Sequence, residues 1–192
     1  MKCVLEIKEL NYAVYMWEFF NQEFIAHRQQ PTINHRDFLQ SELKTITQDI
    51  NAELFFNDNG KPFIRSAYFQ SISISHTLNY LVIQLHKENI AGIDIETQRP
   101  ALVKVQQKFL NNDEINWAHN DIFNLCVLWT AKEALFKVFG TENISLKNHI
   151  SINLQNYPYL IGNIKMNGKS HSFVLYSQQY EHLTLTYVVK KN

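Results

Sequence analysis

Two acidic residues with one residue between them could bind a metal ion on a predicted strand. The segment Gly92-Ile93-Asp94-Ile95-Glu96 alternates, so Asp94 and Glu96 should lie on the same face of that strand. Neighbouring carboxylates repel each other unless a cation or a proton lies between them, and Mg²⁺ prefers oxygen ligands of this kind. The segment indicates either a metal site in a buried strand or two acids that face water on a half-exposed strand.

A second group of candidate residues lies on a predicted helix over 121–139. Trp129, Glu133 and Lys137 recur every four residues, which places them in one row along the apolar side of the helix. A charge on that side is unfavourable unless it is engaged. Glu133 could therefore be a third metal ligand, and Lys137 could bind a phosphate oxygen. The alternative is an ordinary glutamate–lysine pair at the solvent edge of the helix.

A hydroxyl and an imidazole lie together at the end of another predicted strand. Ser75 and His76 could bind a phosphate there, or they could begin and cap a turn. The sequence has no nucleophile elbow, Walker loop, dinucleotide fingerprint or zinc spacing. Side chains and a metal ion would therefore have to hold any phosphate. The two cysteines, Cys3 and Cys126, are far apart, and Cys126 is expected to be buried.

Helices followed by strands, in two successive halves, are predicted to position these residues. In the first half, the pattern predicts helices over 9–29 and 32–50 and strands over 71–75, 80–86 and 90–96. In the second half we expect a helix from residue 100 to about 110, a capping box of Asn111 and Glu114, and a helix over 121–139 that ends at Gly140. Strands are then predicted over 150–154, 160–166, 172–177 and 183–189, with a hairpin turn at Asn167-Gly168. This order favours an α+β fold, a pseudo-twofold duplicate of two helix-plus-antiparallel-sheet halves, residues 1–97 and 98–192.

The charge balance restricts the possible partners. The chain of 192 residues has 18 basic and 18 acidic side chains, which argues against a dedicated nucleic-acid binder. It has no uncharged apolar stretch long enough for a membrane span, and its charged N-terminal residues do not fit a signal peptide. We therefore expect no membrane partner and a cytoplasmic protein.

Taken together, the motifs resemble those of the 4′-phosphopantetheinyl transferases, in particular the larger surfactin-synthetase-activating type. The family's Gly-x-Asp-x-Glu segment is matched by GIDIE at 92–96, and its Trp-x-x-Lys-Glu-Ala-x-x-Lys helix by WTAKEALFK at 129–137. Its Gly-Lys-Pro segment is matched by Gly60-Lys61-Pro62, and its Ser-His segment by Ser75-His76. Four motifs occur in family order between residues 60 and 140.

The resemblance implies a holo-carrier-protein synthase. Such an enzyme transfers the 4′-phosphopantetheine group of coenzyme A to a serine of an acyl or peptidyl carrier protein and releases adenosine 3′,5′-bisphosphate. By position, Asp94, Glu96 and Glu133 would bind Mg²⁺. Glu133 would also take the proton of the carrier serine, and Lys137 would neutralise the pyrophosphate. Lys132 would contact phosphate or only solvent.

The resemblance also implies contacts at the nucleotide end of coenzyme A. Lys61 and Pro62 of the Gly-Lys-Pro segment, with Ser75 and His76, would supply them. The family site would lie between the two halves of a monomer.

Some positions depart from the family pattern or are less determined. An arginine that contacts the 3′-phosphate in the family is replaced by Glu42, and Arg28, Arg36 or Lys44 could take its place. Thr77 replaces the commoner serine after Ser75-His76. Lys104 and Lys108 could contact an acidic carrier, or they could belong to a solvated helix face.

Two other functions stay open at this point. One is a catalytically silent module of the same fold that binds coenzyme A or a carrier. The other is a generic Mg²⁺-dependent phosphohydrolase.

Overall fold

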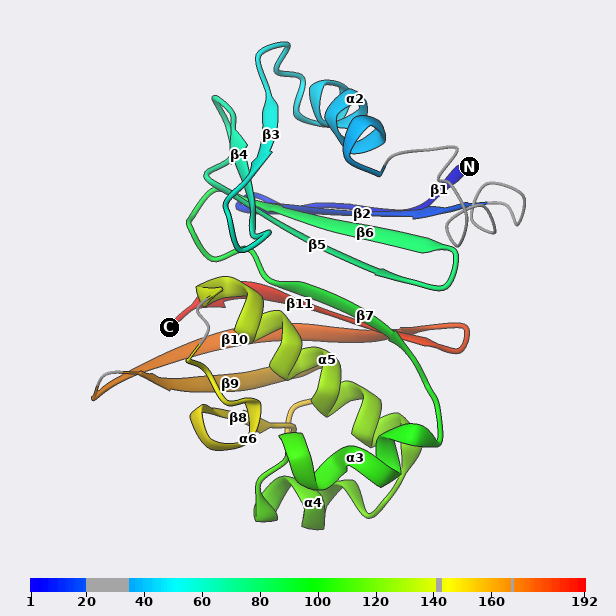
Figure 1. Cartoon of the computed structure of the whole chain (residues 1–192), viewed down its shortest axis with the longest axis vertical. Helices are drawn as coiled ribbons and strands as arrows, with labels where there is room; N and C mark the ends of the chain where they lie inside the picture. Colours follow the sequence, from blue (N-terminus) through cyan, green and yellow to red (C-terminus); the bar gives the residue numbers. More distant parts are fainter. Residues whose placement is uncertain (20–34, 141–142, 167) are drawn as a thin grey trace. The chain divides into compact units, whose positions relative to one another are not determined.

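The computed structural model describes residues 1–19, 35–140, 143–166 and 168–192 (Figure 1). Its internal contacts divide the chain into two compact units, Met1–Ala91 and Gly92–Asn192. The described part of the first unit combines one helix with antiparallel strands, and the second unit combines several helices with antiparallel strands, in agreement with an α+β fold. Among the described residues, no helix is long and apolar enough to cross a membrane.

The first unit is built on a four-stranded antiparallel sheet. Its order is β1-β2-β6-β5, and the strands are β1 (Lys2–Lys8), β2 (Tyr12–Glu18), β6 (Tyr80–His86) and β5 (Ser71–Thr77). Helix α2 (His35–Thr47) buries Leu39 and Leu43 in the same core as Trp17 and Leu81 of the sheet. A separate hairpin joins β3 (Glu53–Phe56) to β4 (Pro62–Arg65).

The helix predicted over 9–29 is wrong for the described part of that range. Residues 12–18 form β2, which pairs with β1 and β6 on its two sides. Ala13 to Trp17 are all buried, so this strand is apolar on both faces and lacks the alternation that marks a half-exposed strand. A continuous apolar run also satisfies the three- and four-residue spacing of a helix, which explains the error. Residues 20–29 lie outside the described residues.

The second predicted helix is present but shorter than expected. Helix α2 ends at Thr47, where Gln48 takes a positive φ of 54°, and Ile50 is 80% exposed. Residues 32–34 of the predicted range lie outside the described residues.

The second unit is a five-stranded antiparallel sheet with helices. Its order is β7-β11-β10-β9-β8, and the strands are β7 (Ile93–Thr97), β11 (Leu183–Lys191), β10 (Lys169–Tyr180), β9 (Tyr159–Met166) and β8 (Ile150–Asn153). The helices are α3 (Ala101–Phe109), α4 (Asn112–Ala118), α5 (Ile122–Phe139) and α6 (Leu146–His149). Helix α5 packs against β7, β11 and β8 of this sheet.

The local signals in the second half are confirmed. Asn111 and Glu114 form the capping box of α4, and Asp121 caps the start of α5. Gly140 ends α5 with a positive φ of 60°, which a glycine adopts without strain. Strands β9 and β10 form the predicted hairpin, with Gly168 at φ 75°; Asn167 lies outside the described residues.

Strand β7 belongs to the second unit rather than to the first half. It pairs with β11 along its whole length, from Ile93 opposite Tyr187 to Thr97 opposite Leu183. The division at Ala91–Gly92 therefore precedes the expected boundary at residue 97. As a result, both acidic segments, on β7 and on α5, lie within one compact unit.

Candidate functional site

Gly92 brings the acidic strand close to helix α5. A Cβ atom at this position would lie 2.2 Å from the carbonyl oxygen of Ala134 and 2.7 Å from Cγ2 of Val138. Only glycine avoids this overlap, so the first residue of the GIDIE segment lets β7 approach the helix backbone. This approach sets the strand that carries Asp94 against the helix that carries Glu133 and Lys137.

The ammonium of Lys137 joins the helix to the strand. Its Nζ donates to Oδ1 of Asp94 at 2.7 Å and to the carbonyl oxygen of Ile93 at 3.0 Å. The Asp94 side chain is 9% exposed and that of Lys137 is 26% exposed. Asp94 and Lys137, predicted from separate motifs, are therefore in direct contact.

Glu133 is a half-buried acid with a strongly altered pKa. Burial, together with the negative charges of Asp94 and Glu96, raises the pKa of Glu133 to about 7, although Lys137 opposes the shift. The carboxyl therefore exchanges its proton near neutral pH, a property suited to a general base.

Glu96 is held at the end of β7 by neighbouring donors. Its Oε2 accepts from Arg99 at 2.9 Å, and its Oε1 accepts from the backbone N–H of Thr97 at 2.8 Å. The Glu96 side chain is 16% exposed. Two acids of the cluster thus already have cationic partners, Asp94 with Lys137 and Glu96 with Arg99.

Buried hydroxyl groups lie beside the acidic strand. Thr186 of β11 is directly opposite Asp94 in the sheet register. Its Oγ1 lies 2.7 Å from Oγ1 of Thr130 on α5 and 2.9 Å from Oγ of Ser177 on β10, and all three residues are fully buried. These bonds connect α5 to β11 and β10. They therefore hold β11, the strand that pairs with the Asp94 strand β7, against the helix.

The three acids have the right chemistry for a hard divalent cation. They supply carboxylate oxygens, which are the ligands that such a cation prefers. The three acids face only two cationic side chains, Lys137 and Arg99, so one negative charge has no cationic partner among them when all three acids are ionised. Within the described residues, no group of three or more His, Cys, Asp or Glu side chains is already arranged to hold a metal ion. The donor set fits Mg²⁺, and the metal role of these three residues stays a proposal.

Lys132 does not join this cluster, and its expected contact with phosphate or solvent is corrected. Its side chain is fully buried and forms an ion pair with Glu114, with Nζ 2.7 Å from Oε2. Nζ also donates to the carbonyl oxygens of Leu146 at 2.9 Å and Ile150 at 2.7 Å. Because an ammonium has three N–H donors, these acceptors can take all of them.

The remaining predicted site residues lie in the first unit. Lys61 follows the turn at Gly60 and precedes Pro62, the first residue of β4, and partial burial lowers the pKa of Lys61. Ser75 is buried and His76 is exposed near the end of β5. The structure brings Ser75 and His76 to one strand end, as predicted, and places Lys61 on the separate hairpin.

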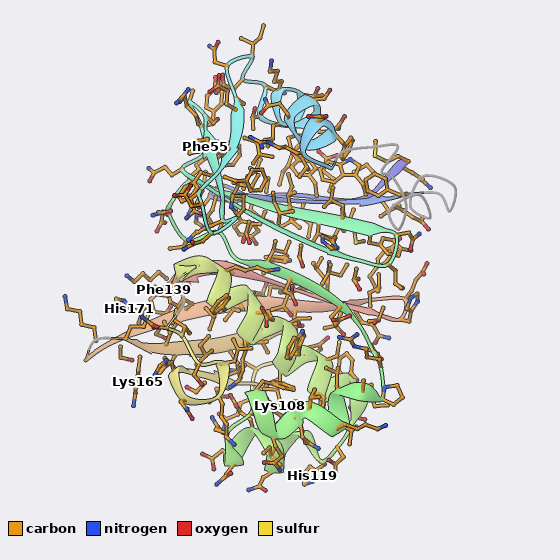
Figure 2. The ribbon with its side chains drawn as sticks, viewed as in Figure 1. Phe55, Lys108, His119, Phe139, Lys165 and His171 are labelled. Carbon is orange, nitrogen blue, oxygen red and sulfur yellow. The ribbon has the colours of Figure 1, made fainter. Side chains whose placement is uncertain are left out.

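The residues considered for the 3′-phosphate and the carrier are distributed as follows. On α2, Glu42 is half-buried and Lys44 is exposed, while the Arg36 guanidinium lies over the Phe56 ring at 5.2 Å. Arg28 lies outside the described residues. Lys104 and Lys108 are exposed on α3, where Figure 2 labels Lys108.

Sequence reasoning missed the contacts that three residues make with the predicted motifs. Arg99 lies three residues after Glu96, and this short spacing of opposite charges was a usable signal. Glu114 was predicted as part of a capping box but not as the partner of Lys132. Thr186 carries no motif, and only strand pairing reveals it.

Comparison with known proteins gives a family match over most of the second unit. The model of the 4′-phosphopantetheinyl transferase superfamily matches residues 90–188, which are 99 of the 192 residues. The matched range contains Asp94, Glu96, Glu133 and Lys137. A search of curated proteins gives no significant match.

Proposed function

Because the chain belongs to the 4′-phosphopantetheinyl transferase superfamily, we propose that it is a holo-carrier-protein synthase that uses coenzyme A and Mg²⁺. The acceptor is a serine of an acyl or peptidyl carrier protein, and the second product is adenosine 3′,5′-bisphosphate. The observation that carries the proposal is the contact between Lys137 and Asp94 beside the desolvated Glu133.

Charge balance supports a cation at this site. A diphosphate would add negative charge to a cluster that already holds three acids against Lys137 and Arg99. We propose that Asp94, Glu96 and Glu133 hold Mg²⁺. When bound, the ion would neutralise the phosphate oxygens and so favour attack at phosphorus.

Glu133 and Lys137 have separate roles in the proposed transfer. The ionised Glu133 accepts the proton of the carrier serine, directly or through a water molecule, as the serine Oγ bonds to the phosphorus that carries pantetheine. The bond from that phosphorus to the bridging oxygen breaks, and adenosine 3′,5′-bisphosphate leaves with the bond's electron pair. Lys137 faces the charge that develops on the phosphate oxygens. A pKa of about 7 leaves a large fraction of Glu133 ionised at neutral pH.

Contacts outside this cluster are also part of the proposal. Lys61, Ser75 and His76, with Pro62 beside Lys61, would bind the nucleotide end of coenzyme A, as the family resemblance implies. Lys104 and Lys108 on α3 offer exposed positive charge to an acidic carrier.

The test is intact-protein mass spectrometry of apo-carrier proteins incubated with this protein, coenzyme A and Mg²⁺. The carriers come from fatty-acid, polyketide and nonribosomal-peptide pathways, and EDTA serves as the control. We expect one carrier to gain the mass of one 4′-phosphopantetheine group, only without EDTA. No gain on any carrier, while calorimetry still detects coenzyme A binding, would favour the silent module instead.

A further inference from the structure

A fully buried ammonium ties helix α5 to three other elements of the second unit. Lys132 Nζ pairs with Glu114 on α4 and donates to the carbonyl oxygens of Leu146 on α6 and Ile150 at the start of β8. Each of these contacts is 2.7–2.9 Å long. The side chain therefore links one residue of α5 to α4, α6 and β8 at a single point.

The Glu114 carboxylate, which pairs with Lys132, also accepts several hydrogen bonds. Glu114 is 3% exposed, and besides Lys132 it accepts the backbone N–H of Asn111 and that of Ile152, both at 2.9 Å. A buried ion pair persists when additional hydrogen bonds satisfy both partners, as they do here. Loss of either residue would leave the other as a buried charge without its counter-ion.

The ion pair also occupies backbone groups of an edge strand. In the described sheet β8 is the last strand, and it pairs with β9 alone. The carbonyl of Ile150 and the N–H of Ile152 bond to Lys132 and Glu114 respectively. Edge strands have unpaired backbone groups, and here the ion pair engages two of them and fixes β8 to α4 and α5.

Two lysines of α5 thus anchor the helix to opposite ends of the sheet. Lys132 reaches β8, and Lys137 reaches Ile93 and Asp94 of β7, the strand at the other end of the sheet order. Glu133 lies between them in sequence, next to Lys132 and one turn before Lys137. With an anchor at each edge, rotation of α5 about its axis is restricted, and so is the direction in which Glu133 points.

We infer that the Lys132–Glu114 ion pair is a positioning pair that holds Glu133 against Asp94 and Glu96. The inference concerns the reaction and rests on the proposed function. Lys132 therefore orients Glu133, the proposed base, and does not contact phosphate. Neither Lys132 nor Glu114 touches the substrate in this account.

Glu114→Gln tests the inference, because it removes the charge but retains a carbonyl acceptor. Asp113→Asn is the matched control, since Asp113 is exposed, adjacent in sequence, and lines the same surface cavity as Glu114. We expect Glu114→Gln to lower kcat by about tenfold or more, with KM for coenzyme A unchanged and the variant folded at the assay temperature. Affinity for Mn²⁺, measured by calorimetry without coenzyme A, should fall as well, and Asp113→Asn should change neither value.

A purely structural ion pair would give a different result. Glu114→Gln would then lower the melting temperature, while the folded protein kept its kcat and its Mn²⁺ affinity, and the inference would be overturned. If Glu114→Gln does not fold, Lys132→Arg replaces it, since Arg keeps the charge but cannot reproduce the three ammonium contacts. The same loss of kcat at constant KM is expected for it, and an unchanged kcat would again overturn the inference.

Hydrogen exchange separates failure of this inference from failure of the proposed function. If the wild-type protein modifies no carrier, the proposed function fails. The amides around Glu133 in α5 should still exchange faster in Glu114→Gln than in the wild type. Faster exchange confined to α4 and β8, with α5 unaffected, would contradict the positioning role whether or not transfer occurs.

Discussion

The Lys137 ammonium lies 2.7 Å from the Asp94 carboxylate, although the two residues are 43 positions apart in the sequence. The contact joins α5 to β7, the two elements that carry the proposed metal ligands. It also gives Lys137 a partner before any substrate is present. Substrate phosphate would therefore compete with Asp94 for this ammonium, and a cation on Asp94 would release it for that purpose.

Removal of the Lys137 ammonium should affect catalysis more than partner binding. In Lys137→Met we expect kcat to fall by about 10²–10³ because charge on the phosphate oxygens loses its cationic partner. Binding of the apo-carrier, measured by calorimetry, should be largely retained. The control is Lys165→Met, since Lys165 is exposed on β9 (Figure 2). Normal turnover in Lys137→Met would remove this lysine from the mechanism.

The pH dependence of transfer should report the ionisation of Glu133. Because the base must be deprotonated, and burial raises the pKa of Glu133 to about 7 in the metal-free site, kcat/KM at low Mg²⁺ should rise with pH through about 7. Saturating Mg²⁺ should move this rise to lower pH, since a cation favours the ionised carboxyl. Both profiles are measured on the wild type, and Glu133→Gln should have little activity at any pH. A profile that is flat between about pH 6 and 8 at low Mg²⁺ would exclude Glu133 as the base.

The raised pKa of Glu133 also predicts how the stability of the metal-free protein changes with pH. The folded-state pKa of Glu133, about 7, exceeds its ordinary value of 4.5, so the folded protein binds this proton more tightly than the unfolded chain does. The contribution of Glu133 to stability is therefore present below about 4.5 and lost as pH rises to about 7.

Glu133→Gln should consequently melt at a higher temperature than the wild type at about pH 8, and at the same temperature at about pH 4. Differential scanning calorimetry in EDTA measures both values. A wild type that is more stable than the variant at the higher pH would contradict the sign of this shift. Mg²⁺ should reduce the difference, since a cation favours the ionised carboxyl.

Gly92 should tolerate no side chain. Gly92→Ala places Cβ 2.2 Å from the Ala134 carbonyl oxygen, so β7 must move away from α5. We expect the free energy of unfolding to fall by about 1–3 kcal/mol, as for other overpacked sites. Urea denaturation measures this loss, and transfer by the folded variant should also decrease. Unchanged stability would show that β7 and α5 are not packed as closely as described.

Arg99 should compete with the metal ion for Glu96. In Arg99→Gln the carboxylate loses a cationic partner at 2.9 Å, so it should bind Mg²⁺ more tightly. Because the Arg99 side chain is 52% exposed, the effect should be small, up to about fivefold in the Mg²⁺ concentration for half-maximal transfer. A higher Mg²⁺ requirement in this variant would instead indicate that Arg99 orients Glu96 for the metal.

The elements around the proposed site were predictable where the signals were local. Asp121 and Gly140 mark the two ends of α5, and the alternation of Asp94 and Glu96 marks β7. Strand β2 was not predictable in the same way, because a strand buried on both faces shows no alternation.

The partners of charged residues were less predictable because they depend on tertiary contacts. Lys132 and Glu133 are neighbours in one motif, yet Lys132 pairs with Glu114 on another helix while Glu133 lies among the acids. Helical spacing alone does not show which α5 face meets α4. That information requires the packing of the whole second unit.

The most direct test follows both products of one reaction. Apo-carrier, coenzyme A and Mg²⁺ are incubated with the wild type or with Asp94→Asn, and both the carrier mass and the released nucleotide are measured. We predict one adenosine 3′,5′-bisphosphate for each carrier modified by the wild type, no release without carrier, and neither product with a folded Asp94→Asn. Release of the nucleotide without carrier would identify a phosphohydrolase, and full transfer by Asp94→Asn would contradict the proposed site.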